Sequence, residues 1–315
     1  MMEEKEIREE LKRTLANDSN NYSKILELSS KLASFDKDNV RFSVDAGVID
    51  RLGTELVARQ ETAVSELVKN SYDADAKIVT LKFENSDSIG GTLFIEDDGL
   101  GMTKGQLVNG FMRISSTDKL RNPLSERYNR KRAGQKGIGR FAVQRLGEKL
   151  TITTQTKEND FALVLTINWE LYKGDVDLVN ITNKITRLPK EKEEGTTLKI
   201  EGLKDRWSQA SIKRIYRYVS AIIQPFPLSE EVKVSNDNDI IVDPGFKTIF
   251  RKIDGDKSVV IADESSMIYD HSLAQIEGWI DTNGLGVYTV VSKQLKIDEI
   301  GEIGSDPDDM SVPFS

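Results

Sequence analysis

One short stretch, at the end of a predicted strand, reads Ile95-Glu96-Asp97-Asp98-Gly99-Leu100-Gly101-Met102-Thr103. The carboxylate of Asp97 could accept a hydrogen bond from a ring amino group such as that of adenine. Glycine has no side chain, so Gly99 and Gly101 would let such a ring approach the backbone closely. Taken alone, the stretch fits an ordinary Asp-Gly turn equally well, and its meaning depends on the neighbouring segments.

A long helical pattern from Val48 to Ala76 precedes this stretch and contains Ser65-Glu66-Leu67-Val68-Lys69-Asn70-Ser71-Tyr72-Asp73-Ala74. Glu66 and Asn70 lie about one helical turn apart, so their side chains project from the same face. Oxygen ligands suit Mg²⁺, and a nearby carboxylate can activate a water molecule. A solvated helix face explains the same spacing, and both interpretations stay open at this point.

A glycine-rich loop follows the acidic stretch and reads Gly134-Gln135-Lys136-Gly137-Ile138-Gly139 before a predicted helix from Arg140 to Leu146. Free backbone amides at such a loop can surround phosphate groups, with Lys136 as a point charge. The chain from Lys119 to Lys136 holds seven basic residues and one acid, Glu126. Charge alone fits a solvated loop, but the position between the two glycine stretches favours a lid that faces phosphates.

The three segments, in this order and spacing, resemble the GHKL superfamily of gyrase, heat-shock chaperone, histidine kinase and MutL ATPases. Glu66 to Ala74 is similar to its N box, Asp97 to Met102 to its Asp-x-Gly-x-Gly box, and Gly134 to Gly139 to its second glycine box. Gly195-Thr196-Thr197-Leu198 also resembles its Gly-Thr element on a late strand. The resemblance covers roughly residues 40 to 225, and within the superfamily the chain looks most like MORC-like and chaperone-like ATPases.

The resemblance implies a role for each matching residue, with ATP and Mg²⁺ as the bound groups. Glu66 would be the catalytic general base, Asn70 the Mg²⁺ ligand and Asp97 the adenine acceptor, while Thr196 would support Asp97 through a shared water. The remaining nucleotide-binding residues would be Gly99, Gly101, Met102, Lys119, Lys136, Gly137, Ile138 and Gly139.

The expected fold class is α+β, with the α/β sandwich known as the Bergerat fold, a mixed sheet carrying helices on one face. Residues 1–40 would be a helical extension and 41–227 the ATP-binding domain, with its lid at about 103–133. A helix that ends at Pro225 and Pro227 marks the boundary. Strand patterns predict a smaller, β-rich and transducer-like region at 228–315. The sequence does not decide whether this region is a complete domain.

Composition excludes several kinds of chemistry. The 315 residues include no cysteine and one histidine, His271, so disulfides, thiolate zinc sites and histidine triads are not expected. His271 lies after the ATP-binding motifs in the sequence. A histidine kinase, in contrast, carries its phosphate-accepting histidine before them. The start of the chain lacks the apolar run of a signal peptide, and no stretch reaches the ~20 apolar residues of a spanning helix. We therefore expect a cytoplasmic protein without a membrane partner.

The resemblance implies that the protein hydrolyses Mg·ATP, and that hydrolysis drives conformational change and dimerisation of a larger machine. The expected partners are a second copy, paired when nucleotide is bound, and an unidentified protein client or effector. The net charge of −8 does not indicate nucleic-acid binding, which stays open. Two alternatives remain: a nucleotide-sensing module with little turnover, and the ATP domain of a kinase that acts on a separate acceptor.

Overall fold

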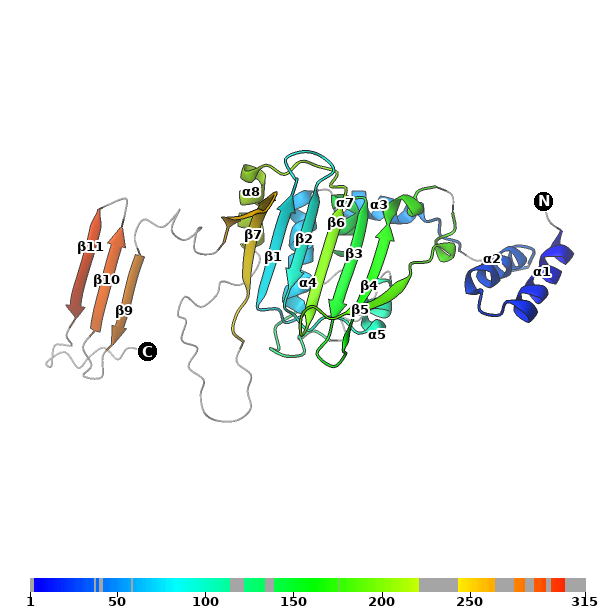
Figure 1. Ribbon diagram of the computed structural model, residues 1–315, viewed down its shortest axis with the longest axis horizontal. Helices are drawn as coiled ribbons and strands as arrows, with labels where there is room; N and C mark the ends of the chain where they lie inside the picture. Colours follow the sequence, from blue (N-terminus) through cyan, green and yellow to red (C-terminus); the bar gives the residue numbers. More distant parts are fainter. Residues whose placement is uncertain are drawn as a thin grey trace. The chain divides into compact units, whose positions relative to one another are not determined.

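Most of the chain is organised around one eight-stranded sheet (Figure 1). The computed structural model describes residues 3–36, 38–39, 42–57, 59–113, 122–133, 139–174, 176–220, 243–263, 275–280, 286–292 and 296–303. The strand order is β5-β4-β3-β6-β2-β1-β7-β8. The strands are β1 (Ile78–Glu84), β2 (Thr92–Asp97), β3 (Lys149–Gln155), β4 (Phe161–Asn168), β5 (Ile185–Pro189), β6 (Gly195–Glu201), β7 (Lys247–Asp254) and β8 (Lys257–Ala262).

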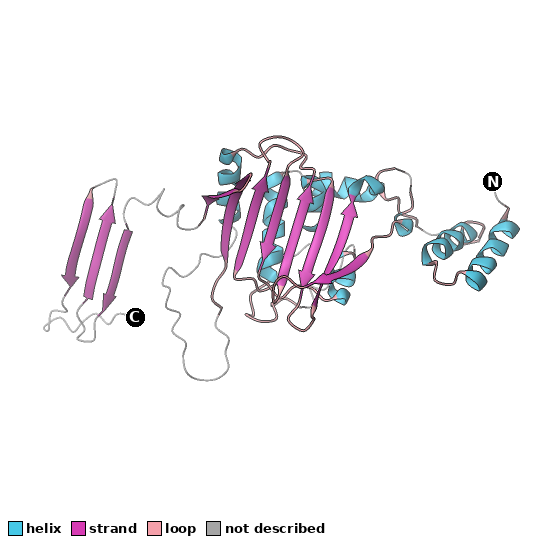
Figure 2. Ribbon diagram, in the orientation of Figure 1, coloured by secondary structure: helices cyan, strands magenta, loops and turns pink. Residues whose placement is uncertain are grey.

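The sheet is mixed, and helices cover one of its faces (Figure 2). Strands β1 and β7 pair in parallel, whereas β1 with β2 and β2 with β6 pair antiparallel. The covering helices are α3 (Gly47–Leu56), α4 (Gln60–Asp73), α7 (Gly139–Leu146) and α8 (Gln209–Ser220). Along β1 the residues alternate between buried and half-buried, as expected for a sheet with one covered face. The predicted α+β class is confirmed.

Aromatic side chains join the sheet to the helical layer. The ring of Phe83 on β1 lies 5.2 Å from that of Trp207 and 5.9 Å from that of Phe250 on β7. Phe250 in turn meets Tyr216 of α8 edge-to-face at 5.2 Å. Phe83, Trp207 and Phe250 are fully buried. Burial of such large apolar groups is a major stabilising term, so β7 is part of the core of this sheet.

The expected long helix from Val48 to Ala76 is two helices in the structure, α3 and α4. The chain leaves helical geometry at Val57 (φ −128°, ψ 65°) and is extended at Arg59 (φ −114°, ψ 142°). Val57 is fully buried at this break. The change of direction thus places an apolar side chain in the core, which periodicity along one straight helix does not predict.

Shorter elements complete this part of the chain. The expected helical extension forms two helices, α1 (Glu4–Asn17) and α2 (Tyr22–Ala33), which bury Ile7 and Leu28. The remaining turns are α5 (Lys104–Gln106), the π-helical turn η1 (Leu107–Phe111), and the 3-10 turns η2 (Trp169–Tyr172) and η3 (Leu178–Asn180). No helix within the described ranges is long and apolar enough to cross a membrane.

The expected boundary after residue 227 lies outside the described residues. Strands β7 and β8 extend the main sheet because β7 pairs with β1, and the first compact unit runs from Met1 to Asp263. The second unit, Glu264–Ser315, contains an antiparallel three-stranded sheet of β9 (Gln275–Ile280), β10 (Gly286–Ser292) and β11 (Ile297–Ile303).

Candidate functional site

A buried carboxylate lies where β2 ends. Asp97 is 8% exposed, and its Oδ1 accepts hydrogen bonds from the backbone amides of Gly99 and Thr196, each at 3.1 Å. Its Oδ2 accepts one from the Ser71 hydroxyl of α4 at 2.9 Å. Burial raises the pKa of Asp97, and these hydrogen bonds offset part of that rise. Because a carboxylate offers roughly four acceptor positions, Asp97 can still accept one more donor.

Glycines close the backbone around Asp97. A Cβ on Gly99 would lie 2.6 Å from the Ala74 carbonyl oxygen, and a Cβ on Gly101 would lie 2.0 Å from that of Gln155. Gly195, at the start of β6, has φ +126° and would place a Cβ 2.3 Å from the Asp97 carbonyl oxygen. The loop after β2 therefore fits between the end of α4 and strands β3 and β6 without room for side chains at these positions.

Two threonines connect the loop to the neighbouring strands. The Met102 amide donates to the Thr154 hydroxyl at 2.8 Å, and the hydroxyls of Thr154 and Thr196 lie 3.0 Å apart. Thr154 is fully buried. The backbone amide of Thr196 supports Asp97 directly.

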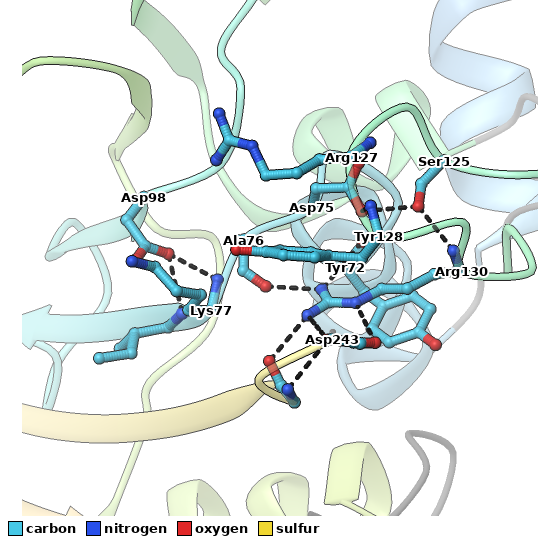
Figure 3. A network of polar contacts seen from close by, with 12 residues as sticks. Tyr72, Asp75, Ala76, Lys77, Asp98, Ser125, Arg127, Tyr128, Arg130 and Asp243 are labelled. Carbon is cyan, nitrogen blue, oxygen red and sulfur yellow. Dashed lines mark hydrogen bonds and ion pairs between the residues drawn. The ribbon is translucent and has the colours of Figure 1, made fainter. Parts of the chain in front are cut away.

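Asp98, next to Asp97, has a different role. Its Oδ1 accepts hydrogen bonds from the backbone amides of Lys77 and Ile78, both at 2.8 Å (Figure 3). Asp98 therefore fixes the end of β2 to the start of β1, and only Asp97 of the acidic pair points into the candidate site.

The exposed edge of α4 carries the candidate catalytic and metal-binding residues. Glu66 and Asn70 are both half-buried, one turn apart. The Glu66 carboxylate pairs with the Lys69 ammonium at 2.8 Å. Near the end of the same helix, Asp73 accepts a hydrogen bond from the Ala133 amide at 2.7 Å. This edge of α4 thus presents a held carboxylate and an amide beside the Asp97 loop.

The described part of the expected lid is held by protein groups. Arg127 pairs with Glu194 at 2.8 Å, and the buried Arg130 pairs with Asp243 at 2.6 Å. Both guanidinium groups are thus paired with carboxylates of the protein in this structure. The expected contacts Lys119, Lys136, Gly137 and Ile138 lie outside the described residues, as does His271, while Gly139 begins α7.

Sequence reasoning missed Ser71 and Thr154, which hold Asp97 and Met102. Ser71 is buried next to the apolar Leu67 and Val68 in the sequence of α4, and its hydroxyl donates to Asp97. A hydroxyl among apolar residues of the N box is a weak signal for such a contact. Thr154 carries no signal, because its role depends on how β3 pairs with β6.

The mixed sheet, the helical layer and the glycine-lined carboxylate form an α+β domain with one candidate ligand site among the described residues. Residues 58–196 match the family described as "Histidine kinase-, DNA gyrase B-, and HSP90-like ATPase". The match supports the resemblance of this domain to the GHKL ATPase superfamily, which the sequence motifs predicted.

Three relatives show how far the similarity extends. The chain is 33% identical over 127 residues to the DNA mismatch repair protein MutL of Clostridium acetobutylicum, which covers 40% of this chain and 19% of MutL. It is 31% identical to heat shock protein 90 of Encephalitozoon cuniculi over 40% of this chain and 22% of that protein. It is 26% identical to the chaperone protein HtpG of Wigglesworthia glossinidia brevipalpis over 59% of this chain and 31% of HtpG.

Proposed function

We propose that this chain binds Mg·ATP beside Asp97, hydrolyses it, and uses the bound nucleotide to change conformation and to pair with a second copy. The observation that carries the proposal is the buried Asp97 carboxylate, which has capacity for one more donor and lies among glycines. An adenine amino group supplies such a donor. The family match over residues 58–196 supports the same ligand.

Each part of the nucleotide has a candidate partner. Asp97 would accept from the adenine amine, with Gly99, Gly101, Met102 and Thr196 around the base. Asn70 would give Mg²⁺ one amide oxygen, with the phosphates and water as its other ligands. The assignment of Lys119, Lys136, Gly137, Ile138 and Gly139 to the phosphates rests on the resemblance of their sequence.

Glu66 is our candidate for the base that activates the attacking water. Its carboxylate is half-buried and is oriented by Lys69 at 2.8 Å. Mg²⁺ would neutralise the phosphates, while Glu66 would hold the water and accept its proton. A sensor module with little turnover and a kinase domain acting on another protein would have no need of this carboxylate, so Glu66 separates the hydrolytic function from both alternatives.

The test is Glu66→Ala, with ATP affinity and phosphate release measured on the same sample. We expect nearly unchanged affinity, because Glu66 does not contact adenine in this proposal. Turnover should fall by roughly a hundredfold or more, the scale for removal of a positioned general base. Hydrolysis at the parent rate would overturn the assignment, and a parent that binds ATP without releasing phosphate would favour the sensor or the kinase.

Asp97→Asn is the matched control for binding. The amide can present a donor where adenine needs an acceptor, so ATP affinity should be lost while the fold is kept. Asn70→Ala should weaken Mg·ATP binding or turnover, and the parent should require Mg²⁺. Equal activity of the parent in a chelator would contradict the metal assignment.

Partners are proposed from the relatives alone. Proteins named as chaperones and as a mismatch repair protein favour a module that acts on something else. The chain spans 19% to 31% of the length of the three relatives described above, so their full activities do not transfer. We propose a client or effector protein and a cytoplasmic location, and the small C-terminal sheet as a transducer-like unit.

A further inference from the structure

Helix α4 ends in a conformation that usually requires glycine. The Ala76 amide donates to the Ser71 carbonyl and the Asp75 amide to the Tyr72 carbonyl, both at 3.1 Å. This is the Schellman pattern, in which the residue after the cap adopts the left-handed conformation. Here that residue is Asp75, with φ 59°. A side chain at this position strains the backbone, so Asp75 calls for an explanation beyond the helix end.

The Asp75 side chain is fully buried, and it binds the described part of the lid (Figure 3). Its Oδ1 accepts from the Ser125 hydroxyl at 2.6 Å and from the Tyr128 amide at 3.3 Å. Its Oδ2 accepts from the Arg127 amide at 2.7 Å. Hydrogen bonds to an ionised acceptor are stronger than neutral ones. One carboxylate therefore holds a turn that lies about fifty residues further along the chain.

That turn belongs to a hairpin formed by residues 122–133, which we call the lid hairpin. Leu124 and Lys131 form an antiparallel bridge. The Ser125 amide donates to the Arg130 carbonyl at 2.9 Å, and the Arg130 amide donates back to the Ser125 hydroxyl at 2.8 Å. The Ser125 hydroxyl therefore links the Asp75 carboxylate to Arg130, on the other arm of the hairpin.

The exit of the lid hairpin is held by a second carboxylate of α4. The Ala133 amide donates to Oδ1 of Asp73 at 2.7 Å. Ala133 is the last residue before the glycine box that begins at Gly134. Asp73 and Asp75 thus fix the hairpin at its exit and at its turn, both against the helix that carries Glu66 and Asn70.

We propose that Asp75 is a positioning residue for phosphate binding: it anchors the lid hairpin on α4 and so fixes the point where the chain enters the glycine box. This inference rests on the proposed function. It also explains why a carboxylate occupies a glycine-favoured backbone position.

The test is Asp75→Gly, which removes the carboxylate and relieves the left-handed strain, so the helix end should be kept. Hydrogen exchange without nucleotide should become at least tenfold faster at the amides of Arg127, Tyr128 and Ala133. ATP and ADP affinity by calorimetry should fall at least tenfold, whereas adenosine binding, followed by NMR titration, should stay within twofold. If Asp75 served only the stability of the fold, Asp75→Gly should weaken the binding of adenosine and of ATP to the same extent.

Two variants serve as controls. Asn85, exposed and also left-handed at φ 50°, lies outside the lid hairpin, and Asn85→Gly should change neither exchange nor affinity. Asp75→Asn keeps the shape and one acceptor oxygen, so it should restore part of the ATP affinity lost in Asp75→Gly, and it serves as the test if the glycine variant does not fold.

Unchanged hairpin exchange in Asp75→Gly would overturn the anchor, and unchanged ATP affinity with faster exchange would overturn the link to phosphate binding. Equal losses for adenosine and ATP would also overturn that link. A parent that binds neither ATP nor adenosine would refute the proposed function instead, while the exchange data would still decide whether Asp75 anchors the hairpin.

Discussion

Gly101 lies where the backbone leaves no room for a side chain. It has φ +69°, and a Cβ would come within 2.0 Å of the Gln155 carbonyl oxygen. We predict that Gly101→Ala lowers the free energy of unfolding by at least the roughly 1–2 kcal/mol of a left-handed non-glycine residue. The loop would have to shift away from Gln155, so ATP affinity should be lost as well. Urea unfolding and an ATP titration measure the two effects.

Gly110 provides the matched control for Gly101. Among the described residues, no heavy atom outside its own turn lies within 4 Å of a Cβ built on Gly110, which belongs to η1. Gly110→Ala should keep the parent's stability or raise it slightly, because alanine restricts the unfolded chain. If both alanine variants bound ATP like the parent, the close packing of Gly101 would have no functional meaning.

Among single residues, the sequence predicted those whose role can be recognised from their immediate neighbours in the chain. Asp97 and the two glycines after it are recognisable because an acid followed by glycines at a strand end is itself the signal. Ser71 and Thr154 are not, since their hydroxyls gain a role only when α4 and β3 are packed against the loop. Asp75 is similar: nothing in the sequence shows that its partners lie in the lid hairpin.

Among the larger elements, β7 is joined to the lid hairpin through Arg130. All five N–H groups of its guanidinium are used: bidentate bonds reach Asp243 at 2.6 and 2.9 Å, and others reach the carbonyls of Tyr72, Ala76 and Gly245. The rings of Tyr72 and Tyr128 lie 4.8 and 4.9 Å from the guanidinium carbon. Lysine could not reproduce this planar arrangement.

We predict that the pair of Arg130 and Asp243 gives the protein an acid-sensitive stability. Partial burial acts to raise the pKa of Asp243, but hydrogen bonds from Arg130 and Gly245, with the Arg130 charge, outweigh it and lower the pKa. A carboxylate with a depressed pKa stabilises the fold above its unfolded pKa of about 3.9 and loses this effect as the pH falls through the folded pKa.

Asp243→Asn should therefore be less stable than the parent near neutral pH, and the difference should shrink as the pH falls below about 4. Chemical unfolding of both proteins across this range measures the difference. Asp160→Asn, at an exposed position, is the control. A difference that stays constant down to the lowest pH would show that the charge of Asp243 is not what holds β7 to the hairpin.

Local periodicity predicted many of the elements but not their pairing. The strand expected to end at Asp97 is confirmed as β2, and the helix expected from Arg140 to Leu146 is confirmed as α7. The exposed strand β5 was missed, because its residues show no clear alternation. The pairing of β7 with β1 was missed too, since no local pattern reports a contact so distant in sequence.

For the whole molecule, the proposed function predicts association that depends on nucleotide. With a non-hydrolysable ATP analogue and Mg²⁺, light scattering should give twice the mass of one chain. Glu66→Ala should form the same pair with ATP itself and keep it longer than the parent, because the nucleotide is not consumed. Asp97→Asn should stay at the mass seen without nucleotide. An unchanged mass in every state would refute the pairing and leave nucleotide binding untouched.

The parallel pairing of β7 with β1 also has a consequence for synthesis. Every residue assigned to ATP leaves the ribosome before β7, yet β1 stays an open strand edge until Lys247 to Ile253 have emerged to pair with it. Unpaired edges template intermolecular strand pairing. A fragment that stops at residue 227 would keep this edge permanently and would uncover Phe83, which packs on Phe250. Such a fragment holds all the assigned nucleotide contacts and should nevertheless aggregate.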